Sequence, residues 1–161
     1  MIYVYVWTPR EGAWGHGTMY IERRDPAQSR YVSWWPLNFQ EVNPFGANRA
    51  DEKTYSEDVA IEGQAPNRCF QINLGREYIA EMAMVRAWDE WRTRRIFYTF
   101  TRNCCSTVAH LLREPGGGAD YSDWEPITWW GPNDIIDYMG WLNRHFTVCE
   151  PLAPPVPPDI T

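Results

Sequence analysis

Alternation of apolar and polar residues predicts a set of β-strands in the first half of the chain. Residues 2–7 are rich in β-branched and aromatic side chains, and residues 15–22 alternate after a glycine-rich turn. Residues 31–35 and 69–74 have the same character, and Pro36 closes the first of these two runs. Short runs of this kind, separated by turn residues, are typical of strands. We therefore expect an antiparallel sheet from the first two-thirds of the sequence.

Three later segments have the spacing of amphipathic helices. The clearest covers residues 75–92, where apolar side chains recur along one stripe. A second begins at the cysteine pair 104–105, continues to about Arg113 and is stopped by the Glu-Pro-Gly-Gly-Gly run of residues 114–118. A third begins at Pro132, because proline favours the first turn of a helix. Strands and helices together predict an α+β fold.

The remaining segments predict a long loop and an extended tail. Residues 37–66 lack sustained periodicity, and loops of that length in compact domains are usually functional or mobile. The chain has 161 residues, enough to bury a core without disulfides or metals. We expect a single domain over residues 1–149 and a proline-rich extended tail over residues 150–161.

Charge and cysteine content narrow the classes of partner. The net charge of −6 argues against nucleic acid or an anionic membrane as the main partner. No apolar run is long enough to span a bilayer, and residues 1–7 do not read as a signal peptide. The four cysteines lack zinc-binding spacing, so we expect free thiols, no metal, no cofactor and synthesis in the cytoplasm.

The strongest chemical signal comes from Cys104 and Cys105. They lie at the predicted start of a helix, where the helix dipole and free N–H groups stabilise a thiolate. A catalytic cysteine also needs a base. His110 lies on the same predicted helix and His145 follows the last helix in a polar context, whereas His16 heads a strand between two glycines. His16 is therefore the candidate base.

The chain carries Gly-His-Gly-Thr-Met-Tyr-Ile-Glu at 15–22, Tyr-Val-Ser-Trp-Trp-Pro at 31–36 and Asn-Cys-Cys-Ser-Thr-Val-Ala-His-Leu-Leu at 103–112. In order and spacing, over roughly residues 14–112, these motifs resemble the circularly permuted papain-like hydrolases. That superfamily includes permuted NlpC-type enzymes, lecithin:retinol acyltransferase-like proteins and PPPDE isopeptidases. The resemblance implies an antiparallel sheet packed against a cysteine-bearing helix, with His16 as the base.

The resemblance leaves two candidates for the nucleophile. In related proteins an asparagine often precedes the nucleophile, which favours Cys104 behind Asn103. A buried apolar residue also lies three positions after the nucleophile, and this position is Val108 counted from Cys105 but Thr107 counted from Cys104. Because the buried stripe holds a helix in place, we prefer Cys105 and keep Cys104 as the alternate nucleophile.

The third catalytic position of the family would fall at Ser33, whose hydroxyl can accept from an imidazole N–H. Glu22 and Asn103 are possible substitutes. Tryptophans are abundant in this sequence, and the pair Trp129–Trp130 and residues 37–66 are candidates for the walls of a cleft. The residues we expect to contact a substrate are Trp14, Trp34, Trp35 and Asn103.

These residues together predict a papain-like cysteine peptidase or amidase, in which a thiolate attacks an amide or peptide carbonyl. The expected partner is a protein, peptide or acyl substrate. A small, tryptophan-rich enzyme without a signal peptide also resembles bacterial effector toxins exported by type VI secretion, with a cognate immunity protein or a secretion-system component as a further partner. The alternatives are a lipid acyl hydrolase or acyltransferase of the same fold, and a non-catalytic aromatic-rich binding module.

Overall fold

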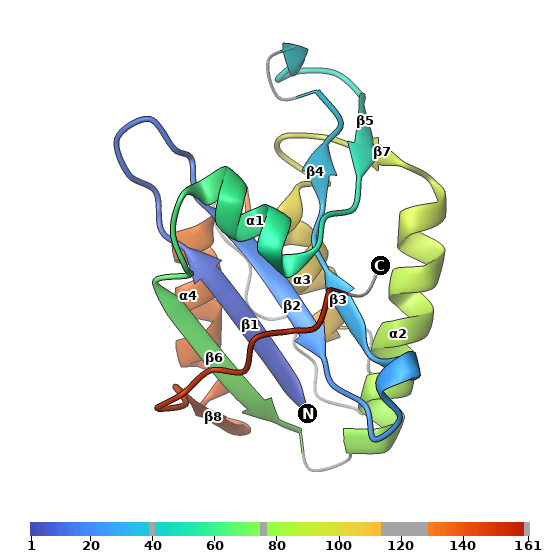
Figure 1. The fold of residues 1–161 in the computed structure, drawn as a ribbon, viewed down its shortest axis with the longest axis vertical. Coiled ribbons are helices and arrows are strands. Elements are labelled where there is room, and N and C mark those ends of the chain that lie inside the picture. Colours follow the sequence, from blue (N-terminus) through green and yellow to red (C-terminus); the bar gives the residue numbers. More distant parts are fainter. Residues whose placement is uncertain (39–40, 75–76, 114–128, 160–161) are drawn as a thin grey trace.

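The fold is organised around a five-stranded antiparallel sheet with strand order β3-β2-β1-β6-β8 (Figure 1). The strands are β1 (Ile2–Trp7), β2 (His16–Ile21), β3 (Arg30–Val32), β6 (Arg68–Asn73) and β8 (Thr147–Cys149). The structure is a computed structural model that describes residues 1–38, 41–74, 77–113 and 129–159. Strand β1 pairs along its length with β2 and β6, so it forms the centre of the sheet.

A second, smaller sheet lies beyond one end of the large sheet (Figure 1). It contains β4 (Trp35–Pro36), β5 (Asn48–Asp51) and β7 (Ile96–Phe97), in the order β4-β5-β7. The short 3-10 helix η1 (Pro26–Gln28) closes the β2–β3 connection. Because β4 follows β3 after only two residues, the small sheet is held close to the end of β2.

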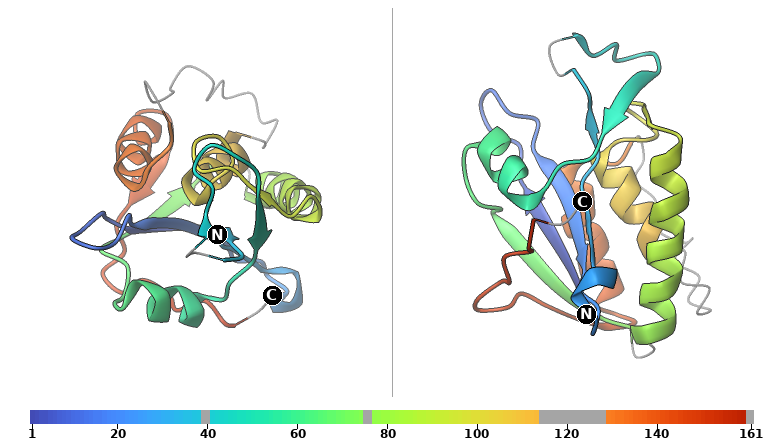
Figure 2. Two further views of the ribbon diagram at one scale, coloured as in Figure 1. Left: turned by 90° about the horizontal axis from the view of Figure 1, so that it is seen from above. Right: turned by 45° about the vertical axis from the view of Figure 1, so that its right-hand side comes forward.

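Helices cover both faces of the large sheet (Figure 2). On one face lie α2 (Glu77–Thr93), α3 (Cys104–Arg113) and α4 (Pro132–Leu142). On the other face lie α1 (Tyr55–Glu62) and the C-terminal tail. The described helices include none that is long and apolar enough to cross a bilayer.

Side-chain alternation in the strands divides the core into two clusters. In β1, Val4 and Val6 face α2, α3 and α4, whereas Tyr5 and Trp7 face α1. The cluster against the three helices is the larger and is mostly aliphatic, while the cluster against α1 is largely aromatic. Both faces of β1 are therefore buried, which explains why it is apolar at nearly every position.

The structure confirms the α+β class and most of the predicted elements. Strands form within residues 2–7 and 15–22, a strand over Arg68–Asn73 matches the predicted run 69–74 to within one residue, and helices form within the predicted cysteine-containing segment and from Pro132 onward. The helix predicted over residues 75–92 is α2. The predicted helix stop at residues 114–118 lies outside the described residues.

Two predictions about the middle of the chain were wrong. The run predicted as one strand over residues 31–35 is divided, because β3 ends at Val32 and Trp35 pairs in the small sheet. Residues 37–66 are not one long loop, since they contain β5 and α1. Strand β8 was not predicted.

Helix α1 has local signals that the periodicity did not show. Its capping box is complete: Thr54 Oγ1 accepts from the Glu57 N–H at 3.3 Å, and Glu57 Oε2 accepts from the Thr54 N–H at 2.7 Å. Gly63 ends the helix in the left-handed region, with φ of 68°. Apolar spacing is weak in α1, because the side chains that it buries include the acidic residues Asp58 and Glu62.

The tail from residue 150 to 159 has neither helix nor strand and lies along the α1 face of the sheet (Figure 1). Hydrogen bonds to β1 and α1 attach it there. Tyr5 donates its hydroxyl to the Pro155 carbonyl at 2.9 Å, and Ser56 donates its hydroxyl to Asp159 Oδ2 at 2.8 Å. The tail is thus extended, and it packs against the domain.

Candidate active site

His16 lies at the first position of β2, at the end of the large sheet next to the small sheet. It pairs with Trp7 in the β1–β2 register, and its side chain is only 1% exposed. The imidazole stacks on the Trp35 ring with 4.0 Å between centroids. Gly15 before it has φ of 78°, and a Cβ there would collide with the Trp7 carbonyl oxygen. Glycine is therefore required for the turn that delivers His16.

The side chain of Ser33 connects His16 to the carboxylate of Asp58. Ser33 Oγ donates to Asp58 Oδ1 at 2.9 Å and lies 3.2 Å from His16 Nε2. Because the Ser33 hydroxyl proton is directed to the carboxylate, its oxygen accepts from the imidazole. His16 Nε2 therefore carries a proton, and Asp58 Oδ2 is also only 3.5 Å from it. This arrangement leaves Nδ1 as the nitrogen that faces a reaction partner.

Asp58 comes from α1 and is completely buried. Besides Ser33, two side chains donate to it: the Tyr31 hydroxyl at 2.7 Å and Trp35 Nε1 at 2.6 Å. A buried carboxylate is tolerated when its oxygens are hydrogen-bonded in this way. Sequence reasoning missed Asp58, because it falls in the segment predicted as a loop. The Thr54–Glu57 capping box would have revealed the helix, although not the direction of this side chain.

Cys104 is the cysteine that meets His16. Its thiol lies close enough to the His16 imidazole and to the Gly17 backbone N–H for both groups to lower its pKa. It begins α3 and is partly exposed, unlike Cys105, which is 1% exposed. The two sulfurs are 3.8 Å apart. The sulfur of Cys104 therefore has both a base and an opening to the surface.

The electrostatics favour a charged pair of Cys104 and His16. A hydrogen bond from the Cys105 thiol lowers the pKa of Cys104 against the opposing effect of burial, and the His16 charge and the Gly17 N–H lower it further. Burial alone would lower the pKa of His16, but the Cys104 sulfur and the Asp58 carboxylate raise it to about 10. These shifts favour the thiolate–imidazolium form of the pair.

Cys105 belongs to the buried side of α3. A Cβ built on Gly17 would lie 3.0 Å from Cys105 Sγ, so this sulfur packs directly under β2. Burial raises the pKa of the Cys105 thiol. The sequence preference for Cys105 over Cys104 as the nucleophile therefore disagrees with these positions. The apolar spacing indicated the buried side of the helix, but Cys105 is itself a member of that side.

Asn103 positions the start of α3. Its Oδ1 accepts from the Ser106 N–H at 2.8 Å, and Ser106 Oγ accepts from the Asn103 N–H at 2.9 Å. Its Nδ2 donates to the carbonyls of Thr99 and Trp130 at 2.8 and 2.9 Å. This is a reciprocal N-cap. The amide that was predicted to contact a substrate is thus used to fix the loop before the cysteines.

The other candidates lie away from Cys104. Glu22 follows the opposite end of β2 and is exposed. His110 stacks on Trp91 with 4.5 Å between ring centroids, and His145 lies against Trp141 at 4.7 Å. Of the candidates for the third position, the structure brings only Ser33 against His16.

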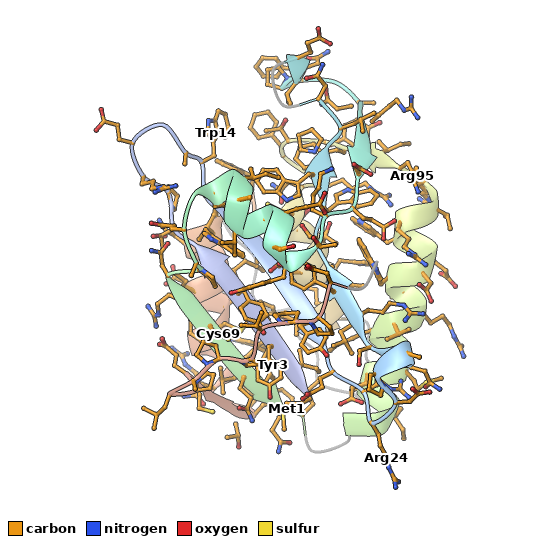
Figure 3. The ribbon with its side chains drawn as sticks, viewed as in Figure 1. Met1, Tyr3, Trp14, Arg24, Cys69 and Arg95 are labelled. Carbon is orange, nitrogen blue, oxygen red and sulfur yellow. The ribbon has the colours of Figure 1, made fainter. Side chains whose placement is uncertain are left out.

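A pocket of about 360 Å³ opens at Cys104. Its walls include all four residues that were predicted to contact a substrate, together with side chains from the β4–β5 connection and from the segment before α4. Figure 3 shows one of them, Trp14, on the β1–β2 loop at the end of the molecule that carries the small sheet. The lining residues are Trp14, Gly15, His16, Trp34, Trp35, Pro36, Val42, Pro44, Phe97, Thr99, Asn103, Cys104, Cys105, Trp129, Trp130, Gly131 and Pro132.

Comparisons with protein-family models, with curated proteins and with solved structures found no match for this chain. Within the described part of the chain, no three His, Cys, Asp or Glu side chains gather as a metal-binding group.

Proposed function

We propose that this chain is a cysteine hydrolase that transfers an acyl group from an amide or ester to water. The observation that carries the proposal is the contact of the Cys104 thiol with the buried His16 imidazole. Behind the imidazole, Ser33 and Asp58 hold its Nε2 proton. Nucleophile, base and orienting group in this order are what thiol acyl transfer needs.

The reaction follows from the charges of the pair. The Cys104 thiolate attacks the carbonyl carbon, and His16 donates its proton to the leaving amine or alcohol as the bond to carbon breaks. The acyl group is then bound to Cys104 as a thioester. His16, neutral in the thioester intermediate, takes a proton from water, the resulting hydroxide attacks the thioester, and the carboxylic acid leaves as the Cys104 thiolate and the His16 imidazolium are restored. Asp58 stabilises the imidazolium each time it forms.

The start of α3 supplies candidate donors for the oxyanion. The N–H groups of Cys104 and Cys105 lie in the first turn, where an α-helix offers no internal acceptor. Donors of this kind, aimed where negative charge develops, typically contribute a 100- to 1000-fold rate increase, as an order of magnitude. The Asn103 cap fixes the orientation of these groups.

The order of the chain, with the histidine strand first and the cysteine helix later, also supports a permuted papain-like architecture as part of this proposal. Within it, the chemistry is that of a peptidase, an amidase or a lipid acyl hydrolase. A role as an exported effector toxin stays a prediction from the resemblance.

The direct test is site-specific alkylation. At pH 6 an ordinary thiol is largely protonated, so iodoacetamide should modify Cys104 at least about tenfold faster than the exposed Cys149 of the same chain. Peptide mass mapping after short exposure measures both sites together.

Three variants complete this experiment. Cys104→Ala should abolish the fast phase, and His16→Ala should slow it to the rate of Cys149. Cys105→Ala removes the thiol whose hydrogen bond lowers the Cys104 pKa, so alkylation of Cys104 should slow but remain faster than that of Cys149. Equal rates at Cys104 and Cys149 in the wild type would refute the proposed function.

A further inference from the structure

The pocket beside Cys104 is walled almost entirely by apolar side chains. Tryptophan, phenylalanine, proline and valine supply most of its lining. Among the residues that the structure describes, no Asp, Glu, Lys or Arg lines it. The charged groups at its base are the Cys104–His16 pair, which the reaction itself uses. A ligand in this pocket therefore meets hydrophobic surface and no countercharge of its own.

Several polar atoms of the lining are already bonded within the protein. Trp35 Nε1 donates to Asp58, and Trp34 Nε1 donates to the Ile96 carbonyl at 3.2 Å. The Asn103 amide is used in the cap of α3. Among the buried polar side-chain atoms of the described lining residues, the exception is the Thr99 hydroxyl, which lacks a partner. Recognition here depends on shape and apolar contact, with few hydrogen bonds.

We infer that this pocket binds the acyl group of an uncharged, apolar acyl donor; the inference rests on the proposed function. In the thioester the acyl group stays attached to Cys104 after the leaving group has departed. The cavity that surrounds this sulfur must therefore accept the acyl side of the substrate. Burial of apolar acyl carbons against the tryptophan walls supplies the binding energy.

Charge excludes other acyl groups. Cys104, His16 and Asp58 together carry a net charge of −1 when the pair is ionised, so an anionic acyl group is repelled. A cationic group would lose its hydration without gaining a carboxylate partner in the lining. Substrates whose acyl side is acidic or basic are therefore poor, and those with an aliphatic or aromatic acyl side are preferred.

The test uses 4-nitrophenyl esters with a constant leaving group: acetate, butyrate, hexanoate and octanoate, with the anionic hemisuccinate beside butyrate. Each buried methylene should raise kcat/KM about fourfold until the pocket is full. We expect octanoate to exceed acetate by roughly 100-fold or more, and hemisuccinate to fall below butyrate by at least about tenfold. A second series, with acetyl esters of longer alcohols, should show a weaker dependence on length.

Two variants locate the effect in the pocket. Trp129 is 36% exposed, so truncation to alanine leaves most of the core intact. Trp129→Ala should reduce the octanoate-to-acetate ratio at least about fivefold. Ile79→Ala removes an exposed apolar side chain of α2 that does not line the pocket, and should leave the ratio unchanged.

The outcomes separate this inference from the proposed function. Ester turnover that requires Cys104 but is independent of acyl length, or equally fast with hemisuccinate, would overturn the apolar acyl site and leave the hydrolase intact. A length dependence confined to the alcohol series would also overturn it. If Cys104→Ala hydrolyses the esters as fast as the wild type, and Cys104 is also alkylated slowly, both the apolar acyl site and the proposed hydrolase function are refuted.

Discussion

At the scale of single residues, Asp58 is the least expected part of the site. It is buried and accepts hydrogen bonds from Tyr31, Ser33 and Trp35, and it lies 3.5 Å from His16 Nε2. His16 and the cysteine pair could be predicted from sequence because their local motifs carry the signal. Nothing in the local sequence distinguishes Asp58 from an ordinary surface acid. Its role depends on a helix crossing the sheet, which is a tertiary property.

Replacing Asp58 by asparagine tests that role. Asp58→Asn keeps the shape but removes a charge that raises the pKa of His16, so the pKa of His16 should fall. The imidazolium that protonates the leaving group is then lost at lower pH, and the alkaline limb of the ester hydrolysis profile should move to lower pH than in the wild type. We expect the ester hydrolysis rate at pH 7 to fall about tenfold or more.

A pH profile of 4-nitrophenyl ester hydrolysis between pH 5 and 11, corrected for the reaction without enzyme, measures this shift. Ser33→Ala is the companion variant, since it removes the bridging hydroxyl without removing the charge. An alkaline limb in the same place for Asp58→Asn and wild type would contradict the assignment of Asp58.

At the scale of elements, β2 and α3 meet at a close contact between Gly17 and Cys105. The sequence predicted both elements and the buried stripe of α3, since each has its own periodicity. It did not predict which cysteine faces the strand, because the rotation of a helix against a sheet depends on packing. Cys105 fills the space beneath Gly17, and this contact turns Cys104 toward His16.

A double-mutant cycle tests this contact. Gly17→Ala brings a Cβ to 3.0 Å from Cys105 Sγ and should destabilise the fold by about 1 kcal/mol or more. In a Cys105→Ala background the sulfur is absent, so the same substitution should cost less. Urea denaturation of the four proteins gives the coupling. Equal costs in both backgrounds would show that the two residues are not packed against each other.

At the scale of the whole molecule, the site joins the two faces of the large sheet. Asp58 comes from α1 on one face, Cys104 comes from α3 on the other, and His16 lies at the end of the strand between them. The α+β class and most elements could be predicted from sequence. The layer formed by α1 could not, because this helix buries acidic residues and lacks a clear apolar stripe.

The pair should also influence global stability in a defined way. His16 has a pKa raised from 6.5 to about 10. Its protonation therefore adds fully to the free energy of unfolding below pH 6.5, and this addition is lost as pH rises toward 10. Cys104 has a pKa lowered from 9.0, so its contribution is complete above pH 9 and is lost as pH falls toward the lowered pKa. Between about pH 6.5 and 9 the His16 contribution falls while the Cys104 contribution rises, so their sum stays level. The summed contribution to the free energy of unfolding decreases below and above this range.

Urea denaturation of wild type and Cys104→Ser between pH 5 and 10 checks this shape, because serine cannot ionise there. The difference in unfolding free energy between the two proteins should be greatest and constant over the middle range. A difference that rises steadily with pH would contradict the charged pair.

The position of Trp14 and Arg24 at opposite ends of the molecule has a practical consequence (Figure 3). The reactive sulfur opens beside the Trp14 loop, whereas Arg24 lies in the β2–β3 connection at the far end. Anchoring the protein to a bead or sensor chip through the β2–β3 connection, at Arg24, would leave the entrance of the pocket facing the solution. Attachment at the Trp14 loop would place the support against the entrance of the pocket and block it.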